Sequence, residues 1–93
     1  MIKSFKCKHT AAIFQGYEVK KFSREVQMIA LRKLIQIEAA TTIDFMRVPP
    51  GNRLEKLGGD RAGFWSIRVN QQFRICFRFE DGHAYEVEIV DYH

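Results

Sequence analysis

The first half of the chain carries a helical pattern of apolar residues. Within residues 24–40, four apolar side chains recur every three to four positions, a spacing that places them on one face of a helix. They are Val26, Ala30, Leu34 and Ile37. Ser23 precedes them, and its hydroxyl can accept a hydrogen bond from a backbone N–H of the first turn. The pattern predicts a long helix that begins after Ser23 and buries one face.

Shorter elements are expected on both sides of this helix. Met1 to Phe5 is predicted to form a short edge strand. Thr10 is a plausible N-cap for a helix that runs to Phe14, with Gly16 ending it. After the long helix, Pro49-Pro50-Gly51 predicts a turn, and Pro50-Gly51 suits the centre of a type II turn.

The second half of the chain changes to a period of two. Apolar and polar residues alternate in segments 64–69, 73–79 and 85–90, the pattern of strands with one buried face. The buried faces are predicted to hold Trp65, Ile67 and Val69, then Phe73, Ile75, Phe77 and Phe79, then Tyr85, Val87 and Ile89. Three-residue loops at 70–72 and 81–83 would keep these faces together, because a one-residue slip turns a strand over.

The predicted pairing brings charged side chains together on the other face. Arg68 lies opposite Arg74, and Arg78 lies opposite Glu86. Two facing arginines repel each other, so the first pair hints at an anion that neutralises it. The elements together predict one α+β domain over residues 1–93, in which an N-terminal strand and two helices pack on one face of a mostly antiparallel sheet. The other face stays partly open.

Basic residues are concentrated in one stretch. Residues 47–78 hold seven Lys and Arg against Glu55 and Asp60, whereas residues 80–91 hold five acids and no Lys or Arg. The seven are Arg47, Arg53, Lys56, Arg61, Arg68, Arg74 and Arg78. The net charge of +4 is only a weak hint of an anionic partner. Several cations beside one carboxylate, Glu55, suit a phosphate-bearing substrate better than a protein core.

Several kinds of site are excluded by what the chain lacks. Cys7 and Cys76 are too few for a disulfide scaffold or a zinc site without further ligands. His9, His83 and His93 have no ligand spacing, and no phosphate loop, GxSxG or HExxH motif occurs. No metal or other cofactor is therefore expected. The chain also shows no signal peptide and no apolar run long enough to span a bilayer, so we expect a cytoplasmic protein.

The remaining chemistry is acid–base and electrostatic chemistry on RNA. Cutting an RNA strand without a metal needs a base for the 2′-hydroxyl proton, cations for the phosphate charge and a proton donor for the leaving 5′-oxygen. Glu55 can be the base, Arg74 and Arg61 the cations, and Tyr92 or His93 the acid. A structural interpretation stays open for each, since charge clusters often serve only as ion pairs or solvated surface.

The chain also resembles the HigB-type toxins of the RelE/ParE superfamily, in the branch of HigB and GraT. The motifs are GDRAGxWSIRVN from Gly59, FRICF from Phe73 and the terminal DYH, and the likeness extends from MIKSF through PPGNRLE to the end. The resemblance implies a RelE-like fold and a toxin that cuts mRNA in the ribosomal A site by 2′-hydroxyl attack. It also implies three partners, namely the ribosome, mRNA and a HigA-like helix-turn-helix antitoxin.

The resemblance assigns roles residue by residue. Many HigB toxins have His at the position of Glu55 and Lys at the position of Gly58, whereas the YoeB branch has a Glu base at the first. Arg74 matches the arginine that stabilises the scissile phosphate. The catalytic residues implied are Glu55, Arg74, Asp91, Tyr92 and His93. The cations expected to hold the RNA are Arg53, Lys56, Arg61, Arg68 and Arg78, with Lys56 or Arg61 standing in for the family lysine.

Two other functions remain open from the sequence. A ParE-like poison of DNA gyrase would use the same fold for binding. A non-catalytic module could use the basic face to bind an acidic antitoxin or a nucleic acid.

Overall fold

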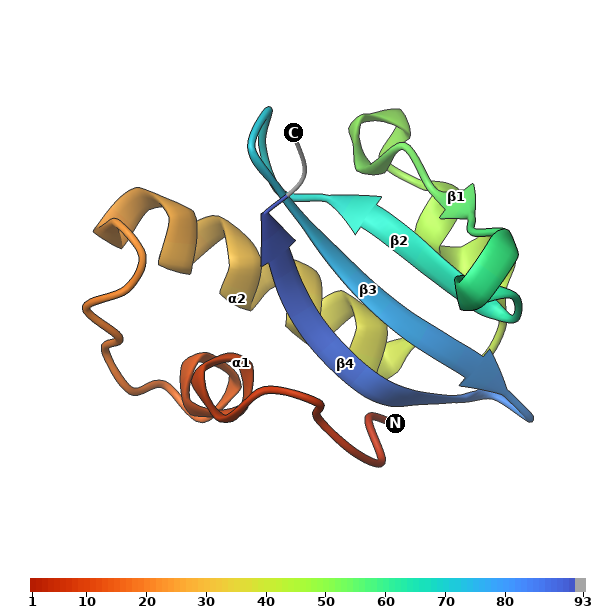
Figure 1. Cartoon of the computed structure of the whole chain (residues 1–93), viewed down its shortest axis with the longest axis horizontal. Helices are drawn as coiled ribbons and strands as arrows, with labels where there is room; N and C mark the ends of the chain where they lie inside the picture. The colour runs from red at the N-terminus through yellow and green to blue at the C-terminus, as the bar shows by residue number, and fades with distance from the viewer. Residues whose placement is uncertain (92–93) are drawn as a thin grey trace.

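The computed structural model describes residues 1–91 and consists of helices packed on one face of a four-stranded sheet (Figure 1). The helices are α1 (Lys8–Phe14) and α2 (Arg24–Ala39). The strands are β1 (Glu55–Lys56), β2 (Phe64–Arg68), β3 (Phe73–Glu80) and β4 (His83–Asp91). They are antiparallel neighbours in the order β1-β2-β3-β4. The predicted α+β class is confirmed.

Helix α2 forms as its sequence predicts. The Ser23 hydroxyl accepts a hydrogen bond from the Val26 N–H at 3.2 Å, which satisfies one of the free donors of the first turn. The buried residues of the helix are Val26, Ala30, Leu34 and Ile37. No helix within residues 1–91 is long and apolar enough to cross a membrane.

Helix α1 differs from the prediction at its start. It begins at Lys8 with Cys7 as N-cap, so the prediction that Thr10 caps it was wrong. Thr10 is instead buried inside the helix, where its hydroxyl accepts a hydrogen bond from the Ile89 N–H of β4 at 3.0 Å. The helix does end before Gly16, whose φ of +92° favours glycine.

The N-terminal segment and the proline turn also depart from expectation. Residues 1–5 form no continuous strand, and only isolated parallel bridges join Ile2 and Phe5 to β4. The proline segment forms a short 3₁₀ helix, η2 (Pro50–Asn52), rather than a type II turn. A type II turn would need a positive φ at Gly51, whereas the left-handed residue here is Arg53 (φ 45°).

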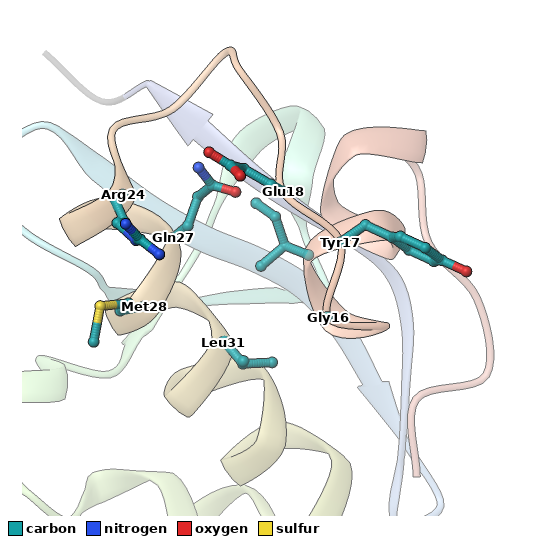
Figure 2. A pocket seen from close by; sticks show the side chains of 8 residues that line it. Gly16, Tyr17, Glu18, Arg24, Gln27, Met28 and Leu31 are labelled. Atoms are coloured by element: carbon teal, nitrogen blue, oxygen red, sulfur yellow. The ribbon is translucent and has the colours of Figure 1, made fainter.

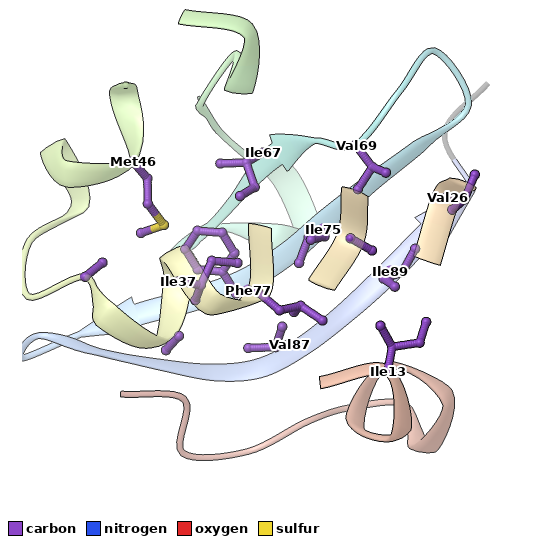
Figure 3. Packing of buried hydrophobic residues seen from close by; sticks show 14 of the residues in the cluster. Ile13, Val26, Ile37, Met46, Ile67, Val69, Ile75, Phe77, Val87 and Ile89 are labelled. Atoms are coloured by element: carbon purple, nitrogen blue, oxygen red, sulfur yellow. The ribbon is translucent and has the colours of Figure 1, made fainter. Parts of the chain in front are cut away.

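The core lies between the helices and the sheet (Figure 3). It includes Ile13 of α1, Leu34 and Ile37 of α2, and Ile67, Ile75, Phe77 and Val87 of the strands. Full burial of each such side chain is worth about 1.5–3 kcal/mol. The helices therefore cover one face of the sheet, and the opposite face takes no part in this core.

The hairpin between β3 and β4 is tighter than predicted. Asp81 and Gly82, with φ of 52° and 80°, form a two-residue turn, and Glu80 pairs with His83. Two positive φ values are typical of a type I′ turn. The turn is one residue shorter than predicted, and β4 has one extra residue in a bulge at Glu86. The two differences cancel, so the pairing beyond the bulge has the predicted register.

The bulge changes which face the start of β4 presents. Arg78 pairs with Tyr85 rather than Glu86, so the prediction for this pair was wrong. Tyr85 moves to the open face, where its ring lies 4.5 Å from the Arg78 guanidinium, and Ala84 is buried in the core. The predicted pairing of Arg68 with Arg74 is confirmed.

Candidate active site

The open face of the sheet carries polar side chains in a row across all four strands. Glu55 of β1 pairs with Ser66 of β2, which pairs with Cys76 of β3, which pairs with Glu88 of β4. Directly paired residues point to the same side of a sheet. Arg74 lies two residues from Cys76 on β3 and therefore shares this face.

Arg74 is a buried arginine held by its surroundings rather than a solvated one. Its Nε donates to the Ser66 hydroxyl at 2.9 Å. Its Nη2 donates to the backbone carbonyl of Arg53 at 2.6 Å and to that of Ser66 at 3.3 Å. Only 8% of the side chain is exposed. These contacts fix one edge of the guanidinium in the protein.

Glu55 lies at the exposed border of this arrangement. Its carboxylate is 3.8 Å from Arg74 Nη1 and 52% of its side chain is exposed. At this distance and exposure the ion pair contributes little to stability. The carboxylate is thus accessible to a ligand, beside an arginine whose orientation is fixed.

A shallow hollow surrounds this pair. It is lined by Arg53, Glu55, Arg68, Asn70, Gln71 and Arg74. Arg68 pairs directly with Arg74 across the strands, and its Nε donates to the Asn70 carbonyl at 3.1 Å. Asn70 in turn accepts hydrogen bonds from the N–H groups of Gln72 and Phe73, which fixes the β2–β3 turn. The hollow therefore concentrates positive charge around one carboxylate.

A second hollow on the same face lies towards the end of β4. It is lined by Leu57, Gly58, Arg61, Val90 and Asp91. Gly58 has an extended backbone (φ −120°), and a Cβ added there would meet nothing within 4 Å. The position could therefore hold a longer side chain.

Arg61 and Asp91, which line the second hollow, also interact with residues outside it. Burial raises the pKa of the Cys76 thiol, and nearby Arg61 opposes this change, so Arg61 reaches across the sheet towards β3. Asp91 Oδ2 accepts a hydrogen bond from Gln72 Nε2 at 3.2 Å. Tyr92 and His93 lie outside the described residues.

Two of the predicted RNA-binding cations lie away from the hollow around Arg74. Lys56 pairs with Trp65, and its Nζ lies 5.8 Å from the centroid of that ring. Arg78 is hydrogen bonded to Glu80, and its Nε lies 3.5 Å from the Glu86 carboxylate. Of the cations predicted to hold RNA, the structure brings Arg53 and Arg68 to Arg74 and places Arg61 in the adjoining hollow.

Ser66 is a site residue that was not predicted from the sequence. The sequence places Ser66 on the polar side of an alternating strand, which is the only sign of a role there. In the structure Ser66 is nevertheless fully buried. Buried hydroxyls need partners, and the partner here is Arg74. The depth of burial comes from the tertiary structure and has no pattern along the chain.

Other parts of the molecule offer different surfaces. A groove between α1 and α2 is lined by residues that include Tyr17, Met28 and Leu31 (Figure 2). None of the predicted site residues within 1–91 lines it. Within residues 1–91, no three His, Cys, Asp or Glu side chains are grouped as metal ligands.

Comparison with known proteins agrees with the resemblance noted in the sequence. The family described as "RelE-like toxin of type II toxin-antitoxin system HigB" matches residues 3–93. The "Endoribonuclease HigB" of Proteus vulgaris is 39% identical over 94 residues, covering 100% of both chains. The "Toxin HigB-1" of Vibrio cholerae serotype O1 is 42% identical over 74 residues, covering 75% of this chain and 78% of that protein.

A solved structure supports the fold independently. A chain of the YoeB–YefM complex from Staphylococcus aureus superimposes with a TM-score of 0.64 at 18% identity, covering 100% of this chain and 95% of that one. The described sheet, its helices and the family match over nearly the whole sequence lead to one conclusion: the chain belongs to the HigB family of RelE-like toxins of type II toxin–antitoxin systems.

Proposed function

We propose that this toxin is a ribosome-dependent endoribonuclease that cuts mRNA and so inhibits translation. The observation that carries the proposal is the pairing of an accessible carboxylate, Glu55, with a rigidly held arginine, Arg74, at 3.8 Å in one hollow. The Proteus vulgaris relative, 39% identical over its full length, is named an endoribonuclease. Family membership and local geometry thus support the same activity.

The proposed reaction is an internal transfer at phosphorus. The Glu55 carboxylate takes the proton from a 2′-hydroxyl, whose oxygen attacks the adjacent phosphorus. The bond from phosphorus to the 5′-oxygen breaks, giving a 2′,3′-cyclic phosphate and a 5′-hydroxyl. Arg74 stabilises the charge that develops on the phosphate oxygens, a contribution typically worth about 10²–10³ in rate.

The leaving oxygen needs a proton donor from the C-terminal end of the chain. Asp91 lies beside the second hollow, at the end of β4, and Tyr92 and His93 follow it in the sequence. We assign protonation or orientation of the leaving group to Tyr92 and His93, with Asp91 in support. Arg61 shares the second hollow and is proposed to supply the cation that relatives place at the position of Gly58.

The proposed partners follow from the family and from the shape of the site. Type II systems pair a toxin with an antitoxin protein, and we propose a HigA-like helix-turn-helix protein for this role. Both hollows are open and shallow, and clustered cations alone give salt-sensitive, largely nonspecific binding to RNA. We therefore propose that the ribosome presents the mRNA, which places the protein in the cytoplasm.

The direct test is inducible expression with mapping of mRNA 5′ ends. The wild type should arrest growth and produce new mRNA ends, and Glu55→Gln should produce few or none. Glu18→Gln is the matched control, because Glu18 is exposed and lines the groove between the helices instead. New mRNA ends of equal abundance in Glu55→Gln would refute the assignment of the base.

The same cultures separate the proposed function from its alternatives. Gyrase-linked DNA breaks with intact mRNA would show a gyrase poison. Growth arrest that persists with neither mRNA cleavage nor DNA breaks would indicate a non-catalytic binding module.

A further inference from the structure

The orientation of Arg74 depends on a backbone carbonyl far away in the sequence. Arg74 Nη2 donates to the Arg53 carbonyl at 2.6 Å, and these residues are 21 positions apart. Ser66 fixes Nε of the same guanidinium at 2.9 Å. A movement of the Arg53 peptide would therefore turn the guanidinium about the contact with Ser66.

The Arg53 peptide is itself held in an unusual conformation. Arg53 has φ 45° and ψ 55°, the left-handed region that residues with a side chain rarely adopt. Its N–H donates to the Pro50 carbonyl at 3.0 Å, and the Asn52 N–H donates to the Pro49 carbonyl at 2.9 Å. Such a conformation persists only when its surroundings enforce it.

Asn52 provides that enforcement from the position directly before Arg53. Its side chain is completely buried. Its Nδ2 donates to Gln36 Oε1 at 2.9 Å and to the Met46 carbonyl at 3.0 Å, while its Oδ1 accepts a hydrogen bond from the Lys33 ammonium. Gln36 also donates to the Val48 carbonyl at 2.6 Å. Lys33 and Gln36 of α2 thus hold the turn at residues 50–53 through the Asn52 side-chain amide.

We propose that Asn52 is a positioning residue for Arg74. The amide ties the turn before β1 to α2 through Lys33 and Gln36, this contact sets the Arg53 carbonyl, and that carbonyl orients the guanidinium towards the scissile phosphate. The inference rests on the proposed function, because it takes Arg74 to be the phosphate-binding arginine. It adds a buried determinant that does not touch the RNA.

Asn52→Asp tests the role of the amide donor. The carboxylate can still accept from Lys33, but it cannot donate to Gln36 Oε1 or to the Met46 carbonyl. The turn should then shift and carry the Arg53 carbonyl with it. Gln36→Met weakens the same contact from the helix side and provides a second variant if Asn52→Asp does not fold.

The matched control is a destabilising change outside this network. Gly82→Ala places a side chain at φ +80°, and its Cβ would lie 3.2 Å from the Thr41 carbonyl oxygen. This turn joins Glu80 to His83, at the opposite end of the β3–β4 pair from Arg74 and its partner Val90. The control should lower stability without altering cleavage at a temperature well below its unfolding transition.

Two measurements decide the proposal. The first is the rate of mRNA cleavage on ribosomes at saturating toxin, with the toxin concentration that gives half the maximal rate. Asn52→Asp should reduce the maximal rate about 10- to 100-fold, since a misplacement of about 1 Å can cost about a hundredfold. Its half-saturating concentration should change less than about threefold, because no RNA-contacting side chain is replaced.

The second measurement is hydrogen exchange of the Arg74 Nε–H, followed by NMR. Exchange should be faster in Asn52→Asp and Gln36→Met than in the wild type, and unchanged in Gly82→Ala. Folded Asn52 and Gln36 variants with wild-type cleavage and wild-type exchange would overturn the proposal. If the wild type itself cuts no mRNA, the proposed function fails, and the exchange measurement still decides whether Asn52 positions Arg74.

Discussion

Replacing Arg74 by alanine should damage both the fold and the site, whereas replacing Glu55 by glutamine should damage the site alone. From the sequence, both residues are expected on an open face, where either could be removed without harm to the fold. The structure separates them, because 8% of the Arg74 side chain is exposed against 52% for Glu55.

The size of the difference follows from the contacts. Arg74→Ala removes the hydrogen bonds that Arg74 donates to the Ser66 hydroxyl, the Ser66 carbonyl and the Arg53 carbonyl. A net contribution of about 1 kcal/mol per hydrogen bond, more when one partner is charged, gives a loss of about 2–4 kcal/mol. Glu55→Gln removes one solvent-exposed pair and should change stability by less than about 0.5–1 kcal/mol.

Urea unfolding followed by the fluorescence of Trp65 measures both values. The arginine-to-alanine control is Arg47, which is exposed and pairs only locally with Asp44 within the described part of the chain. Its replacement should stay within about 0.5 kcal/mol of the wild type. For a small domain, a loss of 2–4 kcal/mol corresponds to a fall in Tm of about 10 °C or more.

Unfolding of Arg74→Ala at the same urea concentration as Arg47→Ala would refute this prediction. In that case the contacts to Ser66 and Arg53 would not hold the arginine in solution. If the predicted loss is found, lost toxicity in Arg74→Ala alone is not evidence for a catalytic role. Glu55→Gln is then the variant that tests for a catalytic role.

Three further predictions follow from particular positions. Gly58→Lys should leave the urea midpoint unchanged, because the backbone of Gly58 is extended and the site of the new Cβ is open. The added cation should raise the rate of mRNA cleavage. A lower rate would argue against a need for a cation in the second hollow. Gly82→Ala should reduce stability by about 1–2 kcal/mol through its positive φ and the Thr41 carbonyl, whereas a neutral result would contradict the observed turn. Cys7 should be alkylated before Cys76, which mass spectrometry would show. Burial by itself raises the pKa of Cys7, but hydrogen bonds at the start of α1 outweigh it and the pKa is lowered overall. Burial raises the pKa of Cys76, so less of its reactive thiolate is present. Equal rates would contradict the packing around Cys76.

Local sequence patterns predicted the elements well where one face is clearly apolar. Helix α2 begins after Ser23, as expected, and buries its predicted stripe. The β2–β3 pairing also follows the alternation and places Arg68 opposite Arg74. These features depend on residues close together in the chain, so propensity and periodicity are sufficient to find them.

The β3–β4 hairpin shows where such reasoning fails. A three-residue loop and a two-residue turn followed by a bulge give the same register at Ile75 and Ile89. The alternation of apolar residues therefore cannot distinguish them. The choice determines whether Tyr85 or Ala84 enters the core, and in the structure the buried residue is Ala84.

By itself, the sequence determined the order and type of the main elements, the concentration of cations beside one carboxylate, and the family. Only the tertiary structure decided which of those cations lie together. The Arg74 guanidinium donates hydrogen bonds to Ser66 and to the Arg53 carbonyl, and the Asn52 side chain hydrogen bonds to α2. These contacts join residues that are far apart in the chain. Their geometry depends on how turns and strands pack in three dimensions, which no local pattern records.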